Sequence, residues 1–172
     1  CGFLLAVNVE EIVTGIENLF DVHFLDPNIY YISRMPSDVH LSDVDRNGFL
    51  DVLVATPGDP SHDLSVRYGP DFTSHRAFAG CAARLNVVEL AIGDMDQDGK
   101  SDAVIGKGAV SPTIEILRGD GSGGFACAFS EDLLGEPPFF IGGLQVADLL
   151  RDSALDVSAI VHTYVTDPLT ET

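Results

Sequence analysis

A nine-residue acidic loop occurs twice in this chain, and it limits what the chain can fold into. The first copy reads D-V-D-R-N-G-F-L-D from Asp43 to Asp51, and the second reads D-M-D-Q-D-G-K-S-D from Asp94 to Asp102. Oxygen ligands at positions one, three and five of a coiled loop point at one ion, and glycine at position six permits the sharp turn. Without a cation these carboxylates would repel one another. The pattern therefore predicts two calcium-binding loops.

Each loop is predicted to supply side-chain oxygens from positions one, three, five and nine, and a backbone carbonyl from position seven. A third copy begins at Asp148, but Leu150 occupies its position three and Ser153 replaces the glycine. We expect this third loop to keep the turn and to lose or weaken its metal. The predicted ligands are Asp43, Asp45, Asn47, Phe49 and Asp51 in the first loop, Asp94, Asp96, Asp98, Lys100 and Asp102 in the second, and Asp148, Asp152 and Asp156 in the third.

The segments around the loops recur in one order, with a period of about 50 residues. Each complete period holds four short β-rich segments separated by turns, which is typical of propeller blades or a related β repeat. We therefore predict an all-β fold of tandem four-stranded antiparallel, blade-like repeats, as a partial β-propeller or an open β-repeat array. The predicted segments are 1–37 (N-terminal, strand-rich), 38–88 (repeat 1), 89–142 (repeat 2) and 143–172 (partial repeat 3).

The N-terminal segment carries no acidic loop of this kind. Its composition predicts strands, with a short helix as the alternative over residues 10–20. The apolar stretch from Cys1 to Val9 lacks a basic flank and is too short to span a membrane, so no transmembrane helix is expected. We expect it to pair as a strand, within the fold or with a neighbouring subunit. A lipid-modified Cys1 is the weaker alternative.

Charge and cysteine content narrow the choice of partners and compartment. The chain has 9 basic and 27 acidic residues and a formal charge of −18, which disfavours nucleic acid and anionic membranes as partners. Three cysteines allow at most one internal disulfide. Cys81 and Cys127 fall late in successive repeats and either form a disulfide between repeats or stay buried thiols. Calcium loops and a disulfide both suit an extracellular or cell-surface location.

Sequence patterns of known catalytic sites are missing, so we expect no enzyme. The histidines are scattered, and no H-E-x-x-H, G-x-S-x-G or phosphate-binding G-x-x-x-x-G-K-[ST] occurs. The adjacent Ser61, His62 and Asp63 would be splayed apart by strand and turn geometry. The tripeptide at residues 118–120, Arg-Gly-Asp, matches an integrin ligand, but a glycine turn explains it better.

Helical calcium loops are a further alternative for the acidic motif. An EF-hand or dockerin loop needs an acidic bidentate ligand at position twelve and a helix on each side. Position twelve is Val54 in the first loop and Ile105 in the second, and both flanks have strand composition. Solvated acidic turns without metal are the other alternative, which the duplication disfavours.

The repeats resemble the FG-GAP repeats, also called VCBS repeats, of integrin alpha-subunit propellers and secreted bacterial proteins. The matching residues are the two loops, the VLVA and AVIG that follow them, and the later turn G-D-G-S-G-G-F. The resemblance covers about residues 38–162. It implies that the loop carboxylates bind calcium and that the ion stiffens the hairpin between the first two strands of a blade. Three blades cannot close a ring, so a fragment, an assembling subunit or an open array is expected.

These observations predict a calcium-stabilised extracellular structural or binding module. Its expected partners are other copies of itself or a cell-surface or extracellular protein. One alternative is the propeller portion of a larger secreted enzyme. Another is a carbohydrate-binding adhesin, although the chain has no Trp and only four Tyr for sugar-stacking platforms.

Overall fold

The computed structural model describes residues 3–4, 31–32, 36–57, 62–81, 87–108, 112–133 and 139–163. The chain divides into two compact units, Cys1–Met35 and Pro36–Thr172. In the first unit, β1 (Phe3–Leu4) pairs antiparallel with β2 (Tyr31–Ile32). The helix considered for residues 10–20 lies outside the described residues, as does most of the apolar stretch that begins at Cys1.

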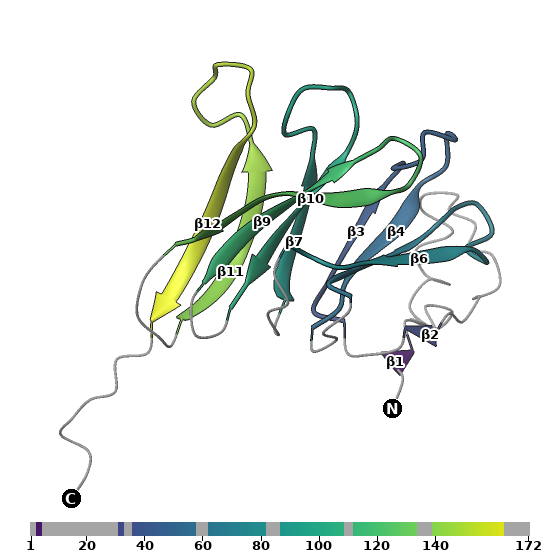
Figure 1. Cartoon of the computed structure of the whole chain (residues 1–172), viewed down its shortest axis with the longest axis horizontal. Helices are drawn as coiled ribbons and strands as arrows, with labels where there is room; N and C mark the ends of the chain where they lie inside the picture. Colours follow the sequence, from purple (N-terminus) through teal and green to yellow (C-terminus); the bar gives the residue numbers. More distant parts are fainter. Residues whose placement is uncertain are drawn as a thin grey trace, which may run out of the picture. The chain divides into compact units, whose positions relative to one another are not determined.

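The second unit contains three antiparallel sheets in chain order (Figure 1). The prediction of four-stranded antiparallel repeats is confirmed, and the described residues contain no helix and no closed ring of blades. The first sheet has β3 (Asp38–Ser42), β4 (Asp51–Ala55), β5 (Leu64–Arg67) and β6 (His75–Phe78); the second has β7 (Val87–Gly93), β8 (Asp102–Lys107), β9 (Thr113–Gly119) and β10 (Phe125–Asp132); the third is the hairpin β11 (Phe139–Ala147) and β12 (Asp156–Thr163).

The first core lies between the first and second sheets. Side chains in a strand alternate between faces, so Leu64 and Val66 of β5 point the same way and are both fully buried. They pack in one cluster with Ile105 and Leu117 of the second sheet. Burial of a large aliphatic side chain stabilises a fold by roughly 1.5–3 kcal/mol, so this cluster is a major source of stability.

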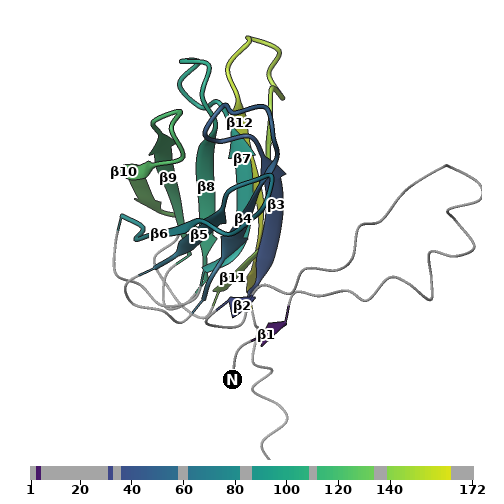
Figure 2. The ribbon, with the colours of Figure 1, turned by 90° about the vertical axis from the view of Figure 1, so that its right-hand side faces the viewer.

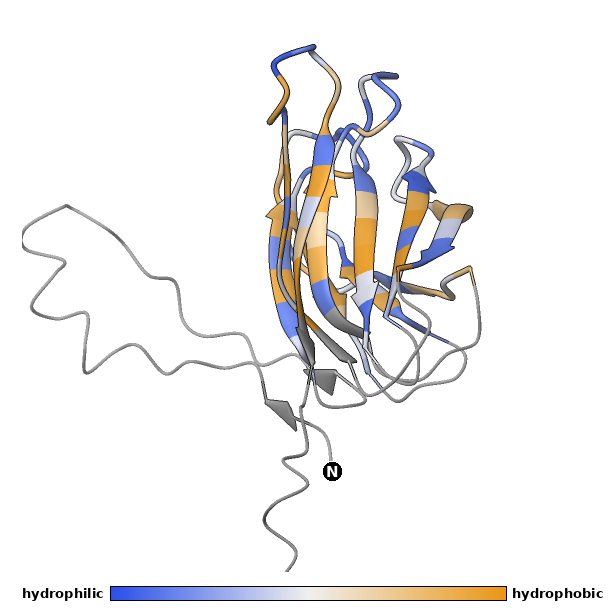
Figure 3. Cartoon of the chain, turned by 90° about the vertical axis from the view of Figure 1, so that its left-hand side faces the viewer, coloured by the Kyte–Doolittle hydropathy of each residue, from blue (hydrophilic) through white to orange (hydrophobic). Residues whose placement is uncertain are grey.

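A second core lies between the opposite face of the second sheet and the hairpin. Val104 and Ile114 pack there against Ile141 and Leu144. All six residues of β8 are buried, because both faces of that strand are covered. Figure 3 shows the resulting pattern as apolar and polar bands that alternate along the strands. The second sheet is therefore the middle layer of this unit.

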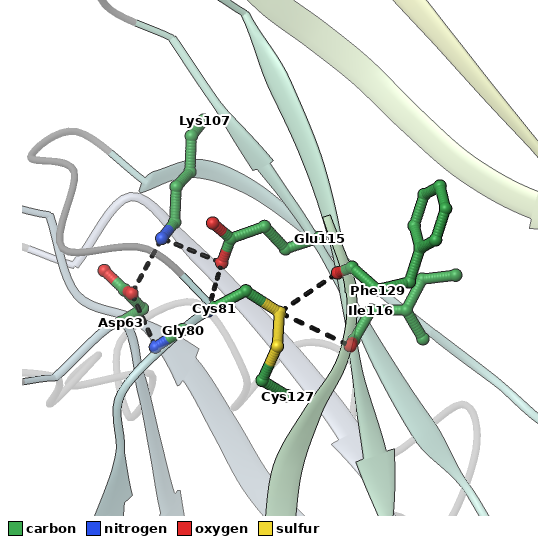
Figure 4. The surroundings of a disulfide bond; sticks show 8 residues. All are labelled: Asp63, Gly80, Cys81, Lys107, Glu115, Ile116, Cys127 and Phe129. Carbon is green, nitrogen blue, oxygen red and sulfur yellow. Dashed lines mark hydrogen bonds and ion pairs between the residues drawn. A yellow bond between two sulfur atoms is a disulfide. The ribbon is translucent and has the colours of Figure 1, made fainter. Parts of the chain in front are cut away.

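A buried group of charges joins the first two sheets (Figure 4). The Nζ of Lys107 lies 2.8 Å from Oδ2 of Asp63 and 2.8 Å from Oε2 of Glu115, and the three side chains are 1%, 8% and 0% exposed. The backbone N–H of Gly80 donates to Asp63, and that of Cys81 donates to Glu115. A Cβ on Gly80 would clash with this group, so the position requires glycine. Buried charges persist only when they are paired and hydrogen-bonded in this way.

A disulfide between Cys81 and Cys127 closes the same junction, which decides between the two alternatives for these cysteines. The two Cα atoms are 4.9 Å apart, and 46 positions separate the residues in sequence. Constraining a loop of this length in the unfolded chain contributes about 4 kcal/mol in the chain-entropy model. The disulfide links the end of the first repeat to β10 of the second.

Replacing Lys107 with methionine is expected to lower the free energy of unfolding by about 3–5 kcal/mol, because Asp63 and Glu115 would remain buried without their cation. Urea unfolding followed by circular dichroism measures the change. Lys100→Met is the control, since Lys100 pairs with Asp98 at the surface and its loss should change stability little. Equal stability of Lys107→Met and wild type would contradict the need for a buried cation.

Candidate metal sites

The three acidic loops each connect the first and second strands of a sheet. They follow β3, β7 and β11, and they extend from the same end of the second unit (Figures 1 and 2). Their shared position follows from the repeat, because each loop enters and leaves at equivalent strand ends.

The first loop brings three carboxylates together. One oxygen from each of Asp43, Asp45 and Asp51 lies within 4.8 Å of the others. The turn that does this is held by Asp43, whose two oxygens accept the N–H groups of Asn47 at 3.0 Å and Gly48 at 2.9 Å. Three negative charges at this spacing are suited to a divalent cation with a preference for hard oxygen ligands.

The second loop repeats this geometry. Asp94, Asp96 and Asp102 converge within the same 4.8 Å limit, and Asp94 accepts the N–H groups of Asp98 and Gly99 at 3.0 and 2.8 Å. Burial raises the pKa of Asp102, and the neighbouring carboxylates of Asp96 and Asp98 raise it further. A cation in the loop would offset both effects, because it favours the ionised carboxylate.

The aspartate at position nine also fixes the third strand of each complete sheet. Asp51 accepts the N–H of Val44 in its own loop and the N–H of Gly69 after β5, both at 2.9 Å. Asp102 accepts the corresponding groups of Met95 and Gly119, also at 2.9 Å. The two aspartates are 0% and 1% exposed. Each oxygen keeps a further lone pair for a metal.

The bonds from Gly69 and Gly119 to the position-nine aspartates were not predicted, although Gly119 opens the glycine turn G-D-G-S-G-G-F noted in the sequence. A Cβ at Gly69 would clash with the carbonyl of Leu50, and one at Gly119 would clash with that of Ser101. Their similar separation in sequence from the position-nine aspartates, 18 and 17 residues, is a signal that could have identified them. These glycines allow the third strand to approach the loop closely.

The side chains at position five lie differently from those of the triads. The Oδ1 of Asn47 accepts the N–H of Phe49 at 2.8 Å. Asp98 accepts the N–H of Lys100 at 2.9 Å and pairs with its ammonium at 2.6 Å, and this partner lowers the pKa of Asp98. Asn47 and Asp98 thus bond to the residue at position seven. Their role as ligands, with that of the carbonyls of Phe49 and Lys100, stays a prediction.

The third loop keeps the turn without the complete acidic set. Asp148 accepts the N–H groups of Asp152 and Ser153 at 3.1 and 3.2 Å, as the first aspartate does in the other loops. Ser153 has a φ of 74°, although only glycine adopts such angles without strain. Leu150 at position three is 75% exposed. Within the described part of the chain, the converging acidic groups are those of the first and second loops.

Contacts between repeats tie the first loop to the second sheet. The guanidinium of Arg46 donates to the carbonyl of Gly99 in the second loop at 2.9 Å. The hydroxyl of Tyr68 donates to the carbonyl of Gly123 at 2.5 Å, and the N–H of Gly123 donates to the carbonyl of Val44 at 3.3 Å. The glycine turn at residues 120–124 is therefore a support for the first loop.

Two other sequence motifs have internal structural partners. In the Arg-Gly-Asp tripeptide, Arg118 pairs with Asp96 at 2.8 Å, and Asp120 accepts the N–H groups of Ser122 and Gly124. In the Ser-His-Asp run, Asp63 belongs to the buried group around Lys107, and the serine lies outside the described residues. Both observations favour structural roles for these residues.

Comparison with known proteins adds one short similarity. No family model matches the chain, and no solved structure matches it. The lipoprotein-releasing system transmembrane protein LolC of Neisseria meningitidis serogroup B (strain ATCC BAA-335 / MC58) is 46% identical over 44 residues. That stretch covers 26% of this chain and 11% of LolC, so the match spans about a tenth of the relative. A match of this extent does not show a family.

Two features bear on location. The disulfide between Cys81 and Cys127 is typical of proteins in oxidising compartments outside the cytoplasm. In the described ranges no helix has the length and apolar character needed to cross a bilayer.

Asp120→Asn is expected to reduce the acid sensitivity of the fold. Hydrogen bonds, first from the N–H of Ser122 and then from that of Gly124, lower the pKa of Asp120. Its contribution to stability is therefore present above the unfolded pKa, near 3.9, and is lost as the pH falls through the lower folded value.

Melting temperatures of both proteins from pH 7 to pH 2 test this expectation. The variant should melt lower than wild type at pH 7, and the difference should shrink below about pH 4. If the difference in melting temperature between the two proteins stays constant from pH 7 to pH 2, the ionised carboxylate of Asp120 is not the source of the acid-sensitive stability.

Proposed function

We propose that this chain is a calcium-stabilised extracellular module with a structural or binding role. The observation that carries the proposal is the convergence of three aspartates at equivalent positions of two successive sheets. Carboxylates, a backbone carbonyl and a flexible loop suit calcium, whereas magnesium requires a stricter octahedron and retains more water. The strand order, the two loops and the glycine turn support membership of the FG-GAP repeats.

The proposed role of the ion is to fix each sheet at its loop end. Aspartates at positions one, three and nine would hold calcium, and the ion would neutralise charges that otherwise repel one another. Asp51 and Asp102 would transmit this order further, because each also binds an N–H group at the end of the third strand. The bond from Arg46 to Gly99 joins the two loops. Calcium would thus order the loop, the hairpin and the neighbouring repeat together.

Exposed apolar side chains support a role in assembly or binding. Val39 and Leu41 point to the same face of β3 and are 46% and 62% exposed. Phe129 and Leu133, at the end of the second sheet, are also exposed. Apolar groups gathered on a surface commonly mark interaction sites. The proposed partner is another copy of the chain or an extracellular protein, and the disulfide supports that compartment.

Calcium is expected to raise the melting temperature, since a ligand at one hundred times its Kd stabilises the folded state by about 2.7 kcal/mol per site. Scanning calorimetry in calcium and in excess chelator measures the shift. Asp45→Asn and Asp96→Asn should each reduce it, whereas Asp71→Asn, an exposed carboxylate outside the loops, should leave it unchanged. The proposal fails if chelation changes neither the melting temperature nor the oligomer size.

The double variant Leu150→Asp, Ser153→Gly is expected to give the third loop a stronger calcium site, because it restores the carboxylate at position three and the glycine at position six. Isothermal titration calorimetry should show one more site than in the wild type. The control is the double variant Leu150→Ala, Ser153→Gly, which relieves the strained backbone at position six but adds no carboxylate. If both double variants bind equally, the position-three carboxylate is not what limits the loop.

A further inference from the structure

The buried charged cluster of Lys107, Asp63 and Glu115 gathers three reactive groups around one point. The amine of Lys107 lies 2.8 Å from a carboxyl oxygen of Asp63 and 2.8 Å from one of Glu115. A Cβ on Gly80 would clash with all three of these atoms, Nζ, Oδ2 and Oε2. An amine, a carboxyl group that could acylate it and a second carboxylate that could carry protons therefore meet in this cluster (Figure 4).

Both complete repeats contribute to the cluster, and their backbones hold its members in place. Lys107 of β8 and Glu115 of β9 stand diagonally across paired strands, where side chains project from the same face of the second sheet. Asp63 immediately precedes β5 of the first sheet. Its N–H donates to the carbonyl of Phe78 at 2.8 Å, and its own carbonyl accepts the N–H of Thr56 at 3.1 Å. The amine thus faces a carboxyl group of the other repeat that is held in position.

The surroundings of the cluster favour a condensation that water would otherwise prevent. The side chains of Lys107, Asp63 and Glu115 are 1%, 8% and 0% exposed. Linking an amine to a carboxylate removes two buried charges, each of which costs free energy away from water. Groups held in contact react as if at concentrations of about 10⁵–10⁸ M. A nitrogen 2.8 Å from a carboxyl oxygen needs only small side-chain rotations to come within about 3–3.5 Å of the carboxyl carbon, where attack begins.

We propose that Lys107 and Asp63 react to form an isopeptide bond, with Glu115 as the proton carrier. The ion pair is the state before the reaction. Its ammonium gives one proton to Asp63, which leaves a neutral amine and a carboxylic acid. Nζ then attacks Cγ, the Nζ–Cγ bond forms, and the nitrogen passes a proton to Glu115. Glu115 gives this proton to the hydroxyl group on Cγ, the C–O bond breaks, and one water molecule leaves. Amine and carboxylic acid thus give amide and water, with no change in oxidation state.

Two backbone N–H groups suit this reaction. The N–H of Gly80 donates to Oδ2 of Asp63 at 2.7 Å, and it would stabilise the negative charge that collects on this oxygen after the attack. The N–H of Cys81 donates to Oε2 of Glu115 at 2.8 Å and holds that carboxylate beside the amine. Two successive residues therefore serve the two carboxyl groups.

The product would be a second covalent connection between the first and second repeats. The disulfide from Cys81 to Cys127 already joins them next to this cluster. A reductant cleaves a disulfide but leaves an amide intact, so the repeats would stay joined after reduction. The acidic loops take no part in the reaction, so the proposal of calcium binding does not depend on this bond.

Mass spectrometry of the whole chain, denatured and reduced, tests the proposal. Wild type should be lighter than its sequence by the mass of one water molecule. Trypsin cleaves after lysine and arginine but not after an acylated lysine. Digestion should therefore yield residues 47–67, which contain Asp63, joined to residues 101–118, in which Lys107 is left uncut. The exposed pair of Lys100 and Asp98, 2.6 Å apart, is the internal control, and trypsin should cleave after Lys100.

Two variants separate the roles of the residues. Lys107→Met removes the amine and should have the full mass of its sequence. Glu115→Gln keeps the amine, Asp63 and an oxygen for the N–H of Cys81, but it cannot take up a proton. Loss of acid–base catalysis slows such reactions by about 10²–10⁴-fold, so this variant should be purified largely unlinked. Thermal unfolding shows whether each variant is folded.

Several results would overturn the proposal, and the wild-type result decides it even if a variant does not fold. Wild type at its full mass would show an ordinary buried ion pair. A mass loss that persists in Lys107→Met would come from another reaction, such as succinimide formation at Asp98 and Gly99. A bond within residues 101–118 alone would assign the linkage to Glu115. A folded Glu115→Gln that is linked as completely as wild type would overturn the role of Glu115 as proton carrier.

Discussion

The aspartate at position nine of each complete loop holds three segments together. Asp51 and Asp102 stand at the first residue of the second strand, and each accepts one N–H from the loop and one from the end of the third strand. A buried carboxylate must be satisfied in this way, because an unpaired one would cost several kcal/mol. The geometry of the loop, the hairpin and the sheet therefore depends on one side chain per repeat.

An ion pair, a hydrogen bond and a disulfide between residues of different repeats join the two complete sheets. Lys107 of the second sheet pairs with Asp63, which precedes β5 of the first sheet, and Glu115 accepts the N–H of Cys81, one of the two disulfide cysteines. Apolar packing alone is tolerant of small shifts between sheets. Directional bonds to buried charges, in contrast, permit one relative placement of the first two sheets, which keeps their acidic loops in contact.

Local patterns predicted the strands and the acidic triads well, because strand alternation and loop spacing are encoded within a few residues. The cluster of Lys107 with Asp63 could not be foreseen, since its partners are 44 positions apart and a lone buried lysine has no local signature. The pairing of Cys81 with Cys127 remained open for the same reason.

Because the second sheet is the middle layer, the repeats contribute unequally to the stability of the unit. In a linear stack, stability is approximately the sum of the intrinsic terms of the layers and the terms of their shared interfaces. A residue such as Val104 or Ile105 of β8 belongs to a layer that contributes to two interfaces, whereas Ile141 of the hairpin contributes to one. Among the described sheets, damage to the second sheet therefore weakens both interfaces, whereas damage to the hairpin weakens the interface that it shares with the second sheet. Nearest-neighbour coupling thus makes the second sheet the one on which both cores depend.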